Sequence, residues 1–384
     1  MTSQIRRQPR GGDERPPATL SYGDEFGPYV ITGFAGSGAT SYVYQARRRD
    51  RFEPVAIKVL HPHLVADPTR RLTFYREARI MMRMDHGNVV RFERIVEDGD
   101  TLAFVMEYVD GLTLDQWCRR YADDIDEVAL ACVFVDILRG VTAAHRQGVI
   151  HRDLKPGNVL VTESEGRAVA KIIDFGVARF VDEPLTSRER SKVIGTAAYI
   201  SPEEVVDPES VCQASDLYSI GVMLYEAACG QRPFAEMEVR DLLRAHARQA
   251  PQRPTRLNPE LSRSFEDVIL QTLDKTPGSR ISTAPELIGA LEAALHGTYR
   301  GASGEPHKSG RPSDVEELEE ARTTQWERTP DDSADERTAG RAVGRFFRRC
   351  LQTALVLITA TGAEDGDDDR HYLNRSPDPG VPFR

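Results

Sequence analysis

The chain has 384 residues, 50 lysines and arginines against 60 aspartates and glutamates, and a formal net charge of −10. This length is enough for one two-lobed domain with tails. The excess of acid argues against general nucleic-acid binding, which requires a basic surface. The five cysteines are odd in number and lack metal-ligand spacing, so we expect reduced thiols and a cytoplasmic protein. The first residues contain arginine and proline but no apolar run typical of a signal peptide.

Residues 1–25 are rich in Arg, Gly and Pro, and we expect a disordered tail there. An extended segment over Tyr29–Ile31 comes next, and we assign Gly33 to the end of that strand. The stretch from Gly36 to Val43 follows, and its residues are mostly small. Such residues let two strands and their turn lie close to a phosphate chain, with backbone N–H groups facing its oxygens. Taken alone, this glycine pattern also fits an ordinary hairpin turn.

An apolar run that begins at Val55 ends at Lys58. A lysine at the end of a buried strand requires a matching negative charge. Apolar residues recur at helical spacing from Phe74 to Met81, and Glu77 falls within this window. The pattern therefore predicts a helix that carries a carboxylate suited to that lysine, although an isolated Glu77 would be a solvated helix residue.

Residues 102–109 are typical of a buried strand that leads into a linking segment. From Leu112 to Leu295, helical patterns alternate with short loops, whereas the chain before them is rich in strand patterns with one main helix. His61 and His63 lie in a loop-like run that contains proline, and we expect both on the surface rather than on a metal ion.

The most informative run is HRDLKPGN from His151, followed by DFG from Asp174. Asp153 can accept the proton of an attacking hydroxyl, and Lys155 can offset negative charge on a moving phosphoryl group. Asn158 and the aspartate of DFG offer the hard oxygen ligands that Mg²⁺ prefers. Six specified residues at fixed offsets make a charged surface turn a poor explanation of this run.

This order resembles the catalytic and metal-binding loops of protein kinases, H-R-D-x-x-x-x-N followed by D-F-G. The motifs are similar to those of the bacterial, eukaryotic-like (Hanks-type) serine/threonine kinases, because HRDLKP and Gly-Thr-x-x-Tyr differ from the tyrosine kinase pattern. The resemblance covers about residues 26–295. It implies an α+β, bilobal protein-kinase fold, with a β-rich N-lobe over about 26–109 and an α-rich C-lobe over about 110–295. It also implies ATP and Mg²⁺ (or Mn²⁺) between the lobes.

The resemblance implies catalytic roles for Asp153, Lys155, Lys58 and Glu77, with the last two as an ion pair. Met106 corresponds to the gatekeeper beside the adenine. Ser41 stands where the family has a third glycine, which makes the loop less permissive. The nucleotide-binding positions that the resemblance implies are Gly36, Ser37, Gly38, Ala39, Ser41, Val43, Ala56, Lys58, Met106, Glu107, Val109, Asn158, Leu160 and Asp174. Two of them, Asn158 and Asp174, would also hold the metal ion.

Further along, Gly195–Glu203 resembles the end of an activation segment, with Ser-Pro-Glu where the family commonly has Ala-Pro-Glu. Thr196 in this segment corresponds to the substrate platform. By the same resemblance, Asp216 holds the backbone of the catalytic loop and Arg280 pairs with the glutamate at 203. These two roles are structural.

Arg152 directly precedes the catalytic aspartate and offers a cation for a phosphate on the activation segment. The polar stretch between Asp174 and Glu203 contains the hydroxyl groups most suited to autophosphorylation. The predicted sites are Thr186, Ser187 and Ser191. A segment that needs no modification is the alternative.

Residues 297–340 are charged and poor in aliphatic side chains, so we expect a disordered acidic and polar linker. Thr329 and Asp332 resemble the phosphothreonine pattern that forkhead-associated domains bind, but the pattern is short and an exposed linker threonine is the favoured explanation of Thr329. Residues 341–363 contain a short apolar helix candidate, and 364–384 form an acidic tail that we expect to be disordered. The apolar run is shorter than the ~20 residues of a spanning helix, so docking on protein is favoured over membrane contact.

Two other functional classes remain open alongside an active protein kinase with protein substrates. A small-molecule phosphotransferase shares a related aspartate and asparagine loop, but the VAIK run, Lys155 and Arg280 disfavour that class. A pseudokinase that acts as a scaffold typically loses Lys58, Asp153 or the DFG aspartate, and this chain retains all three.

Overall fold

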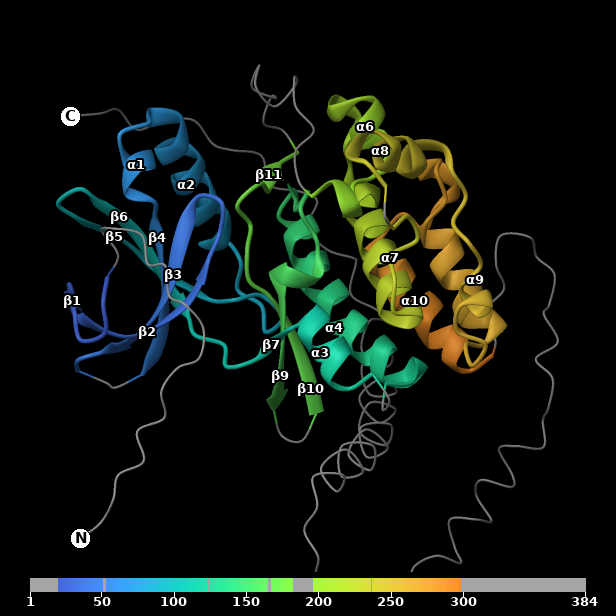
Figure 1. Ribbon diagram of the computed structural model, residues 1–384, viewed down its shortest axis with the longest axis horizontal. Helices are drawn as coiled ribbons and strands as arrows, with labels where there is room; N and C mark the ends of the chain where they lie inside the picture. The colour runs from blue at the N-terminus through green and yellow to red at the C-terminus, as the bar shows by residue number, and fades with distance from the viewer. Residues whose placement is uncertain are drawn as a thin grey trace, which may run out of the picture. The chain divides into compact units, whose positions relative to one another are not determined.

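The computed structural model describes residues 20–50, 53–122, 125–164, 167–181, 196–235 and 237–297. Within these ranges a curled sheet with one long helix comes first, and a helical region follows (Figure 1). The predicted α+β class and its order along the chain are confirmed. The predictions for the linker after residue 297, the apolar segment 341–363 and the tail 364–384 lie outside the described residues, as do those for 1–19.

All neighbouring strands of the first sheet are antiparallel, in the order β1-β2-β3-β4-β6-β5. Its central strands β4 and β6 are buried along nearly their whole length, and Tyr29, Tyr44 and Ile57 fill the core on one side. The strands are β1 (Glu25–Phe26), β2 (Tyr29–Ser37), β3 (Ser41–Arg48), β4 (Pro54–Leu60), β5 (Phe92–Asp98) and β6 (Thr101–Glu107).

Two details of this sheet differ from the sequence-based expectation. Gly33 does not end its strand, because β2 continues through two irregularities of register to Ser37. The ordered chain also begins before residue 26: Leu20 packs against the sheet core, and the N–H group of Gly23 donates to the carbonyl of Ile31 at 2.9 Å.

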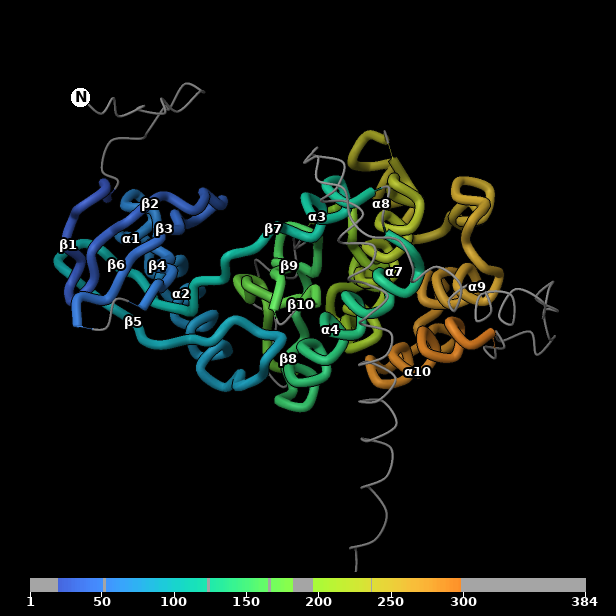
Figure 2. The backbone as a smooth tube through the Cα atoms, turned by 90° about the horizontal axis from the view of Figure 1, so that it is seen from below, coloured from blue at the N-terminus to red at the C-terminus, as the bar shows by residue number. Residues whose placement is uncertain are grey.

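The long helix of this region is α2 (Pro68–Met81), and the short α1 (Pro62–Val65) precedes it. The side chain of Asp67 caps the start of α2 by accepting hydrogen bonds from two backbone N–H groups of its first turn. Phe74 packs against Phe104 of β6 with ring centroids 4.9 Å apart, so the predicted apolar face of the helix contacts the sheet. Glu77 is buried on the same face. Figure 2 shows α2 beside the strands.

The helical region is built around two apolar helices, α4 and α7. By length and composition α4 could cross a membrane, but 72% of its apolar window is buried inside the protein, as expected of a core helix. The helices are α3 (Leu114–Arg120), α4 (Glu127–Arg146), α6 (Pro202–Val206), α7 (Gln213–Cys229), α8 (Val239–Arg248), α9 (Arg263–Thr272) and α10 (Ala284–Leu295).

Two small sheets lie at the beginning of this helical region. The first has the order β10-β9-β7 and the second pairs β11 with β8, all antiparallel. The catalytic-loop sequence lies between β8 and β9, and the DFG sequence lies between β10 and β11. The strands are β7 (Leu112–Thr113), β8 (Val149–Ile150), β9 (Val159–Ser164), β10 (Arg167–Ile172) and β11 (Arg179–Phe180).

The surface position predicted for His61 is wrong. Only 7% of this residue is exposed, because its ring packs edge-on against the ring of Tyr42 with centroids 4.1 Å apart. His63 is exposed, as predicted.

Candidate active site

Lys58 near the end of β4 lies between two carboxylates. Its Nζ donates to Glu77 Oε1 of α2 at 2.5 Å and to Asp174 Oδ1 at 3.0 Å. The contact predicted between Lys58 and Glu77 is therefore present, and the DFG aspartate joins it from 116 residues further along the chain. Three groups that the sequence placed far apart converge on one point.

Burial and mutual attraction shift the pKa values of these three groups away from their ordinary values. Burial tends to lower the pKa of Lys58, but the carboxylates of Glu77 and Asp174 outweigh it and hold that pKa above its ordinary value. Burial raises the pKa of Glu77 to about 7, because attraction to the ammonium offsets only part of the desolvation. Burial also acts to raise the pKa of Asp174, yet Lys58 and further hydrogen bonds hold it well below its usual range. Asp174 is therefore fully ionised at neutral pH.

Gly176 leaves room for this aspartate, because a side chain here would force the carboxylate to move by a few tenths of an ångström. Its N–H group donates to Asp174 Oδ1 at 2.9 Å. A Cβ at this position would lie 3.0 Å from the same oxygen and 3.5 Å from Glu77 Oε2. The glycine of DFG thus lets the backbone approach the carboxylate closely.

The carboxylate of Asp153 accepts hydrogen bonds from its own loop and from the segment that carries Thr196. Its Oδ1 accepts from the backbone N–H and from the hydroxyl of Thr196, both at 2.9 Å. Its Oδ2 accepts from Lys155 Nζ at 2.5 Å and from Asn158 Nδ2 at 3.2 Å. Lys155 also donates to the Thr196 hydroxyl at 3.0 Å. The four predicted residues therefore form one connected cluster.

The backbone of the catalytic loop is held by Asp216, as predicted. Its carboxylate accepts the N–H groups of His151 and Arg152, each at 2.9 Å. Arg152 has φ +67°, and among the described non-glycine residues it alone has a positive φ. This left-handed conformation is costly for a residue with a side chain, so the anchor at Asp216 is needed to maintain it.

The oxygen atoms of Asn158 and Asp174 are suited to bind a divalent cation. Asn158 Nδ2 donates to the carbonyl and to Oδ2 of Asp153, at 2.8 and 3.2 Å, which turns its amide oxygen Oδ1 away from that carboxylate. With Asp174 ionised, two hard oxygen donors are available. The described ranges contain no group of three or more His, Cys, Asp or Glu side chains that could hold an ion unaided. Two protein ligands supplemented by substrate phosphates match the way Mg²⁺ is usually bound.

The positions predicted to contact the nucleotide lie on neighbouring strands. In the register of the sheet, Val43 is opposite Lys58 and Ala56 is opposite Met106. Leu160 at the start of β9 is paired with Thr113 of β7. The remaining predicted positions follow the chain: Gly36 and Ser37 end β2, Gly38 and Ala39 lie in the turn, Ser41 begins β3, Glu107 ends β6, and Val109 follows it.

Arg280 and Glu203 form the predicted buried pair, with Arg280 Nη1 and Nη2 3.0 and 3.1 Å from the two carboxylate oxygens. Only part of the Arg152 guanidinium is paired, because Nε and Nη1 are buried without a hydrogen-bond partner among the described residues. Its Nη2 lies 3.1 Å from Glu204 Oε1, and both side chains are buried. The predicted phosphorylation sites, Thr186, Ser187 and Ser191, lie outside the described residues.

Two residues of this region escaped the sequence reasoning. His145 Nε2 lies 2.8 Å from Asp216 Oδ2, so it helps to orient the anchor of the catalytic loop. Glu204 supplies the carboxylate for Arg152. His145 could have been found from the sequence, because a histidine on the buried face of an apolar helix needs a polar partner. Glu204 could not, because nothing in two consecutive glutamates indicates which of them pairs with Arg152 and which with Arg280.

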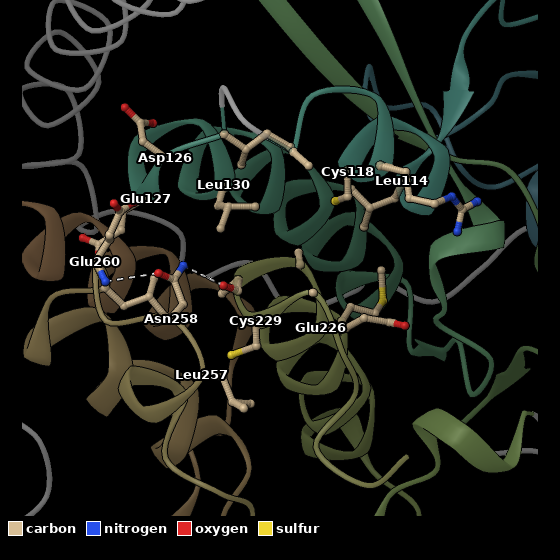
Figure 3. A pocket seen from close by; sticks show the side chains of 18 of the residues that line it. Leu114, Cys118, Asp126, Glu127, Leu130, Glu226, Cys229, Leu257, Asn258 and Glu260 are labelled. Atoms are coloured by element: carbon tan, nitrogen blue, oxygen red, sulfur yellow. Dashed lines mark hydrogen bonds between the residues drawn. The ribbon is translucent and has the colours of Figure 1, made fainter. Parts of the chain in front are cut away.

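A separate cavity of about 990 Å³ lies among α3, α4 and α7 (Figure 3). Leu114, Cys118, Leu130, Cys229 and Leu257 contribute to its wall. Among the described residues, none of the predicted nucleotide-binding positions lines it, and Pro156 is its closest link to the catalytic loop. This cavity is therefore distinct from the candidate active site.

Comparison with known sequences agrees with this geometry. The family model described as a protein kinase domain matches residues 29–293. The chain is 34% identical over 280 residues to serine/threonine-protein kinase PkaA of Streptomyces coelicolor, covering 70% of this chain and 50% of the relative. It is 33% identical over 263 residues to serine/threonine-protein kinase PknB of Mycobacterium leprae, covering 67% and 42%. With serine/threonine-protein kinase pkn2 of Myxococcus xanthus the identity is 36% over 263 residues, covering 67% and 31%.

The chain thus spans half or less of the length of these curated relatives. The family model nevertheless covers well over half of the chain and includes every residue of the cluster around Lys58 and Asp153. Members of this family in general use ATP and a divalent metal ion. The chain belongs to the protein kinase family and is of the bacterial, Hanks-type kind.

Proposed function

We propose that this chain is a serine/threonine protein kinase that transfers the γ-phosphoryl group of ATP to serine or threonine hydroxyls of proteins. One contact supports the proposal most directly. The hydroxyl of Thr196 lies 2.9 Å from Asp153 Oδ1, the distance at which a carboxylate can take a proton from an attacking hydroxyl. The site therefore already accommodates an aliphatic hydroxyl of the type it would phosphorylate.

The hydrogen bonds of Asp153 indicate how a substrate would enter. An ionised carboxylate offers about four lone-pair positions, and Thr196, Lys155 and Asn158 supply four donors. The Thr196 hydroxyl is the donor that a substrate hydroxyl can replace like for like. Lys155 already lies 3.0 Å from that hydroxyl, so it can retain Thr196 after the exchange.

In the proposed reaction the substrate oxygen attacks the γ-phosphorus, and the bond from that phosphorus to the β,γ-bridging oxygen breaks. Asp153 takes the hydroxyl proton, and ADP leaves with the bridging oxygen. Lys155 stabilises the negative charge on the transferred group. Because the transition state is loose, positioning and charge account for nearly all of the catalysis.

Asn158 and Asp174 would hold Mg²⁺ or Mn²⁺, which when bound neutralises charge on the phosphates. The low pKa of Asp174 keeps this ligand ionised throughout the physiological range. Lys58 is already shared by two carboxylates, and it is placed to exchange part of this contact for phosphate oxygens. Measuring phosphoryl transfer with each metal ion would distinguish the two.

The direct test is phosphoryl transfer from [γ-³²P]ATP to the chain itself and to casein. The comparison includes wild type, Asp153→Asn and Lys58→Met, followed by phosphoamino acid analysis. We expect phosphoserine and phosphothreonine with the wild type and a loss of several orders of magnitude with either variant. Wild type that binds ATP without transfer would indicate a pseudokinase. Transfer to small aminoglycosides but not to protein would indicate a small-molecule phosphotransferase.

We also propose that Thr186, Ser187 or Ser191 is autophosphorylated. A phosphate there could bind Nε and Nη1 of Arg152, which have no hydrogen-bond partner among the described residues, while Nη2 stays with Glu204. Mass spectrometry of wild type and Asp153→Asn, each incubated with ATP, checks this. We expect phosphate on at least one of these residues in wild type and on none in the variant, whereas full wild-type activity with no phosphate on any of the three contradicts the proposal.

A further inference from the structure

His61 connects the end of a core strand to the turn of the glycine-rich loop. It directly follows β4, whose preceding residues include Lys58, and directly precedes α1. Its backbone is fixed on both sides, because its N–H donates to the carbonyl of Thr40 at 2.8 Å and its carbonyl accepts from Leu64 at 2.8 Å. The residue therefore has a defined position independent of its side chain.

The side chain of His61 adds a contact to the turn itself. Its Nε2 lies 3.0 Å from the carbonyl oxygen of Gly38. That turn is closed by a hydrogen bond from the N–H of Gly38 to the carbonyl of Ser41, at 2.8 Å. Ser41 is in turn paired with Leu60 in the ladder between β3 and β4. The imidazole thus connects the far end of the turn, at Gly38, to the end of β4.

We infer that His61 is a positioning residue for ATP, holding the Gly38–Ala39 peptide group so that its N–H faces the nucleotide phosphates. In a trans peptide the carbonyl and the following N–H point in opposite directions. Fixing the carbonyl of Gly38 on His61 therefore directs the N–H of Ala39 to the other side of the loop. An unrestrained peptide could turn its carbonyl oxygen toward the phosphates, where two partial negative charges would repel.

The surroundings of the ring select the form that can donate. A carbonyl oxygen only accepts, so Nε2 must carry the proton. Nδ1 is buried and has no hydrogen-bond partner among the described residues. A protonated Nδ1 would be a buried donor without an acceptor, which costs more than an unused acceptor. The contact with Tyr42 holds the ring in this orientation.

This inference rests on the proposed function, because it assigns the loop to ATP. Its test is the affinity of the full chain for a fluorescent ATP analogue, with KM for ATP, KM for casein and kcat measured in parallel. The variants are His61→Ala, which removes ring and donor, His61→Phe, which retains a ring without a donor, and His61→Gln, which retains an N–H donor of similar reach. His63→Ala is the matched control, because His63 stacks on the His61 ring at 5.6 Å and is exposed.

We expect Kd and KM for ATP to rise about three- to tenfold in the Ala and Phe variants, the effect of losing one hydrogen bond. We expect the Gln variant to recover most of that loss, the control to match wild type, and KM for casein to change less than about twofold. Amide hydrogen exchange over residues 34–44 should accelerate in the Phe variant without nucleotide. That readout separates a loosened turn from a general loss of stability.

Three outcomes would overturn the inference: wild-type ATP affinity in the Phe variant, equal losses in the Gln and Ala variants, or an equal loss in the control. Failure of the proposed function has a different signature. Wild type itself would then transfer no phosphate to protein, whether or not it binds ATP, while hydrogen exchange in the nucleotide-free chain would still report whether His61 restrains the turn.

Discussion

Replacing Arg280 by methionine should lower the free energy of unfolding by about 3–5 kcal/mol. The guanidinium is completely buried and makes two ionic contacts with Glu203, at 3.0 and 3.1 Å. It also donates to the carbonyl of Ala214 at 2.7 Å and to that of Asp274 at 3.0 Å. Methionine has a similar length but can satisfy none of these acceptors.

The expected magnitude comes mainly from what remains after the substitution. Burial acts to raise the pKa of Glu203, and hydrogen bonds and attraction from Arg280 hold it below its usual range instead. Without the arginine, this buried carboxylate retains the Ser215 hydroxyl at 2.6 Å but no countercharge. An unpaired buried charge of this kind accounts for the range given, which is much larger than the value of an average hydrogen bond.

Urea unfolding of the full chain, monitored by tryptophan fluorescence, provides the measurement. Arg119→Met is the matched control, because Arg119 contacts Asp115 at 2.5 Å but is 70% exposed, and such pairs contribute about 0–1 kcal/mol. A similar, small loss in both variants would refute the reasoning, since burial would then not determine the cost. A double variant with Glu203→Leu should recover part of the loss, because it removes the stranded carboxylate.

Three further results are expected. Gly176→Ala places a Cβ 3.0 Å from Asp174 Oδ1, so this carboxylate must move by a few tenths of an ångström, and we expect kcat to fall by up to about tenfold, less than the roughly 100-fold of a 1 Å misplacement. Asp216→Asn presents an amide N–H₂ or a single oxygen to two backbone N–H groups, so kcat should fall at least about tenfold while the fold is retained. Burial lowers the pKa of His246 to about 3 from an ordinary 6.5. As the pH falls, this histidine therefore binds a proton in the unfolded chain before it does so in the folded chain. The stability present above pH 6.5 is then lost on acidification, and His246→Phe should remove about 2 kcal/mol of the loss between pH 7 and pH 5.

Each of these results has a clear contrary outcome. Steady-state kinetics at saturating ATP would contradict the first if the alanine variant retained wild-type kcat, and the second if the asparagine variant did. Circular dichroism checks that both variants are folded. For the histidine, equal changes of the urea midpoint with pH in wild type and variant would show that another group titrates.

Contacts that depend on the family pattern were predictable from the sequence. Lys58 with Glu77, and Arg280 with Glu203, were each expected, and both pairs are present. In each case the motif specified a charged residue that a core environment would not accept without its partner. The order of strands followed by helices was predictable for a similar reason, because apolar spacing differs between the two regions.

Contacts that depend on tertiary detail were not predictable. His61 lies next to prolines in a run that resembles a loop, and its burial comes from the turn of the glycine-rich loop folding back over it. Arg152 pairs with Glu204, 52 residues away, and nothing in the spacing distinguishes that glutamate from its neighbour. Local patterns predict which groups need a partner, whereas the choice of partner depends on packing between distant segments.

The strained backbone at Arg152 can be explained by comparing two energies. A non-glycine residue in the left-handed region costs about 1–3 kcal/mol. The carboxylate of Asp216 accepts two backbone hydrogen bonds from this turn, each at 2.9 Å, and a hydrogen bond to a charged group contributes about 1.5–3 kcal/mol. The two bonds together outweigh the strain, so the turn keeps its conformation without help from a substrate. Asp153 follows directly after the strained residue, and its orientation is therefore fixed before ATP or protein binds. In the proposed phosphoryl transfer, where catalysis would come mainly from positioning, a pre-formed turn of this kind is what the chemistry requires.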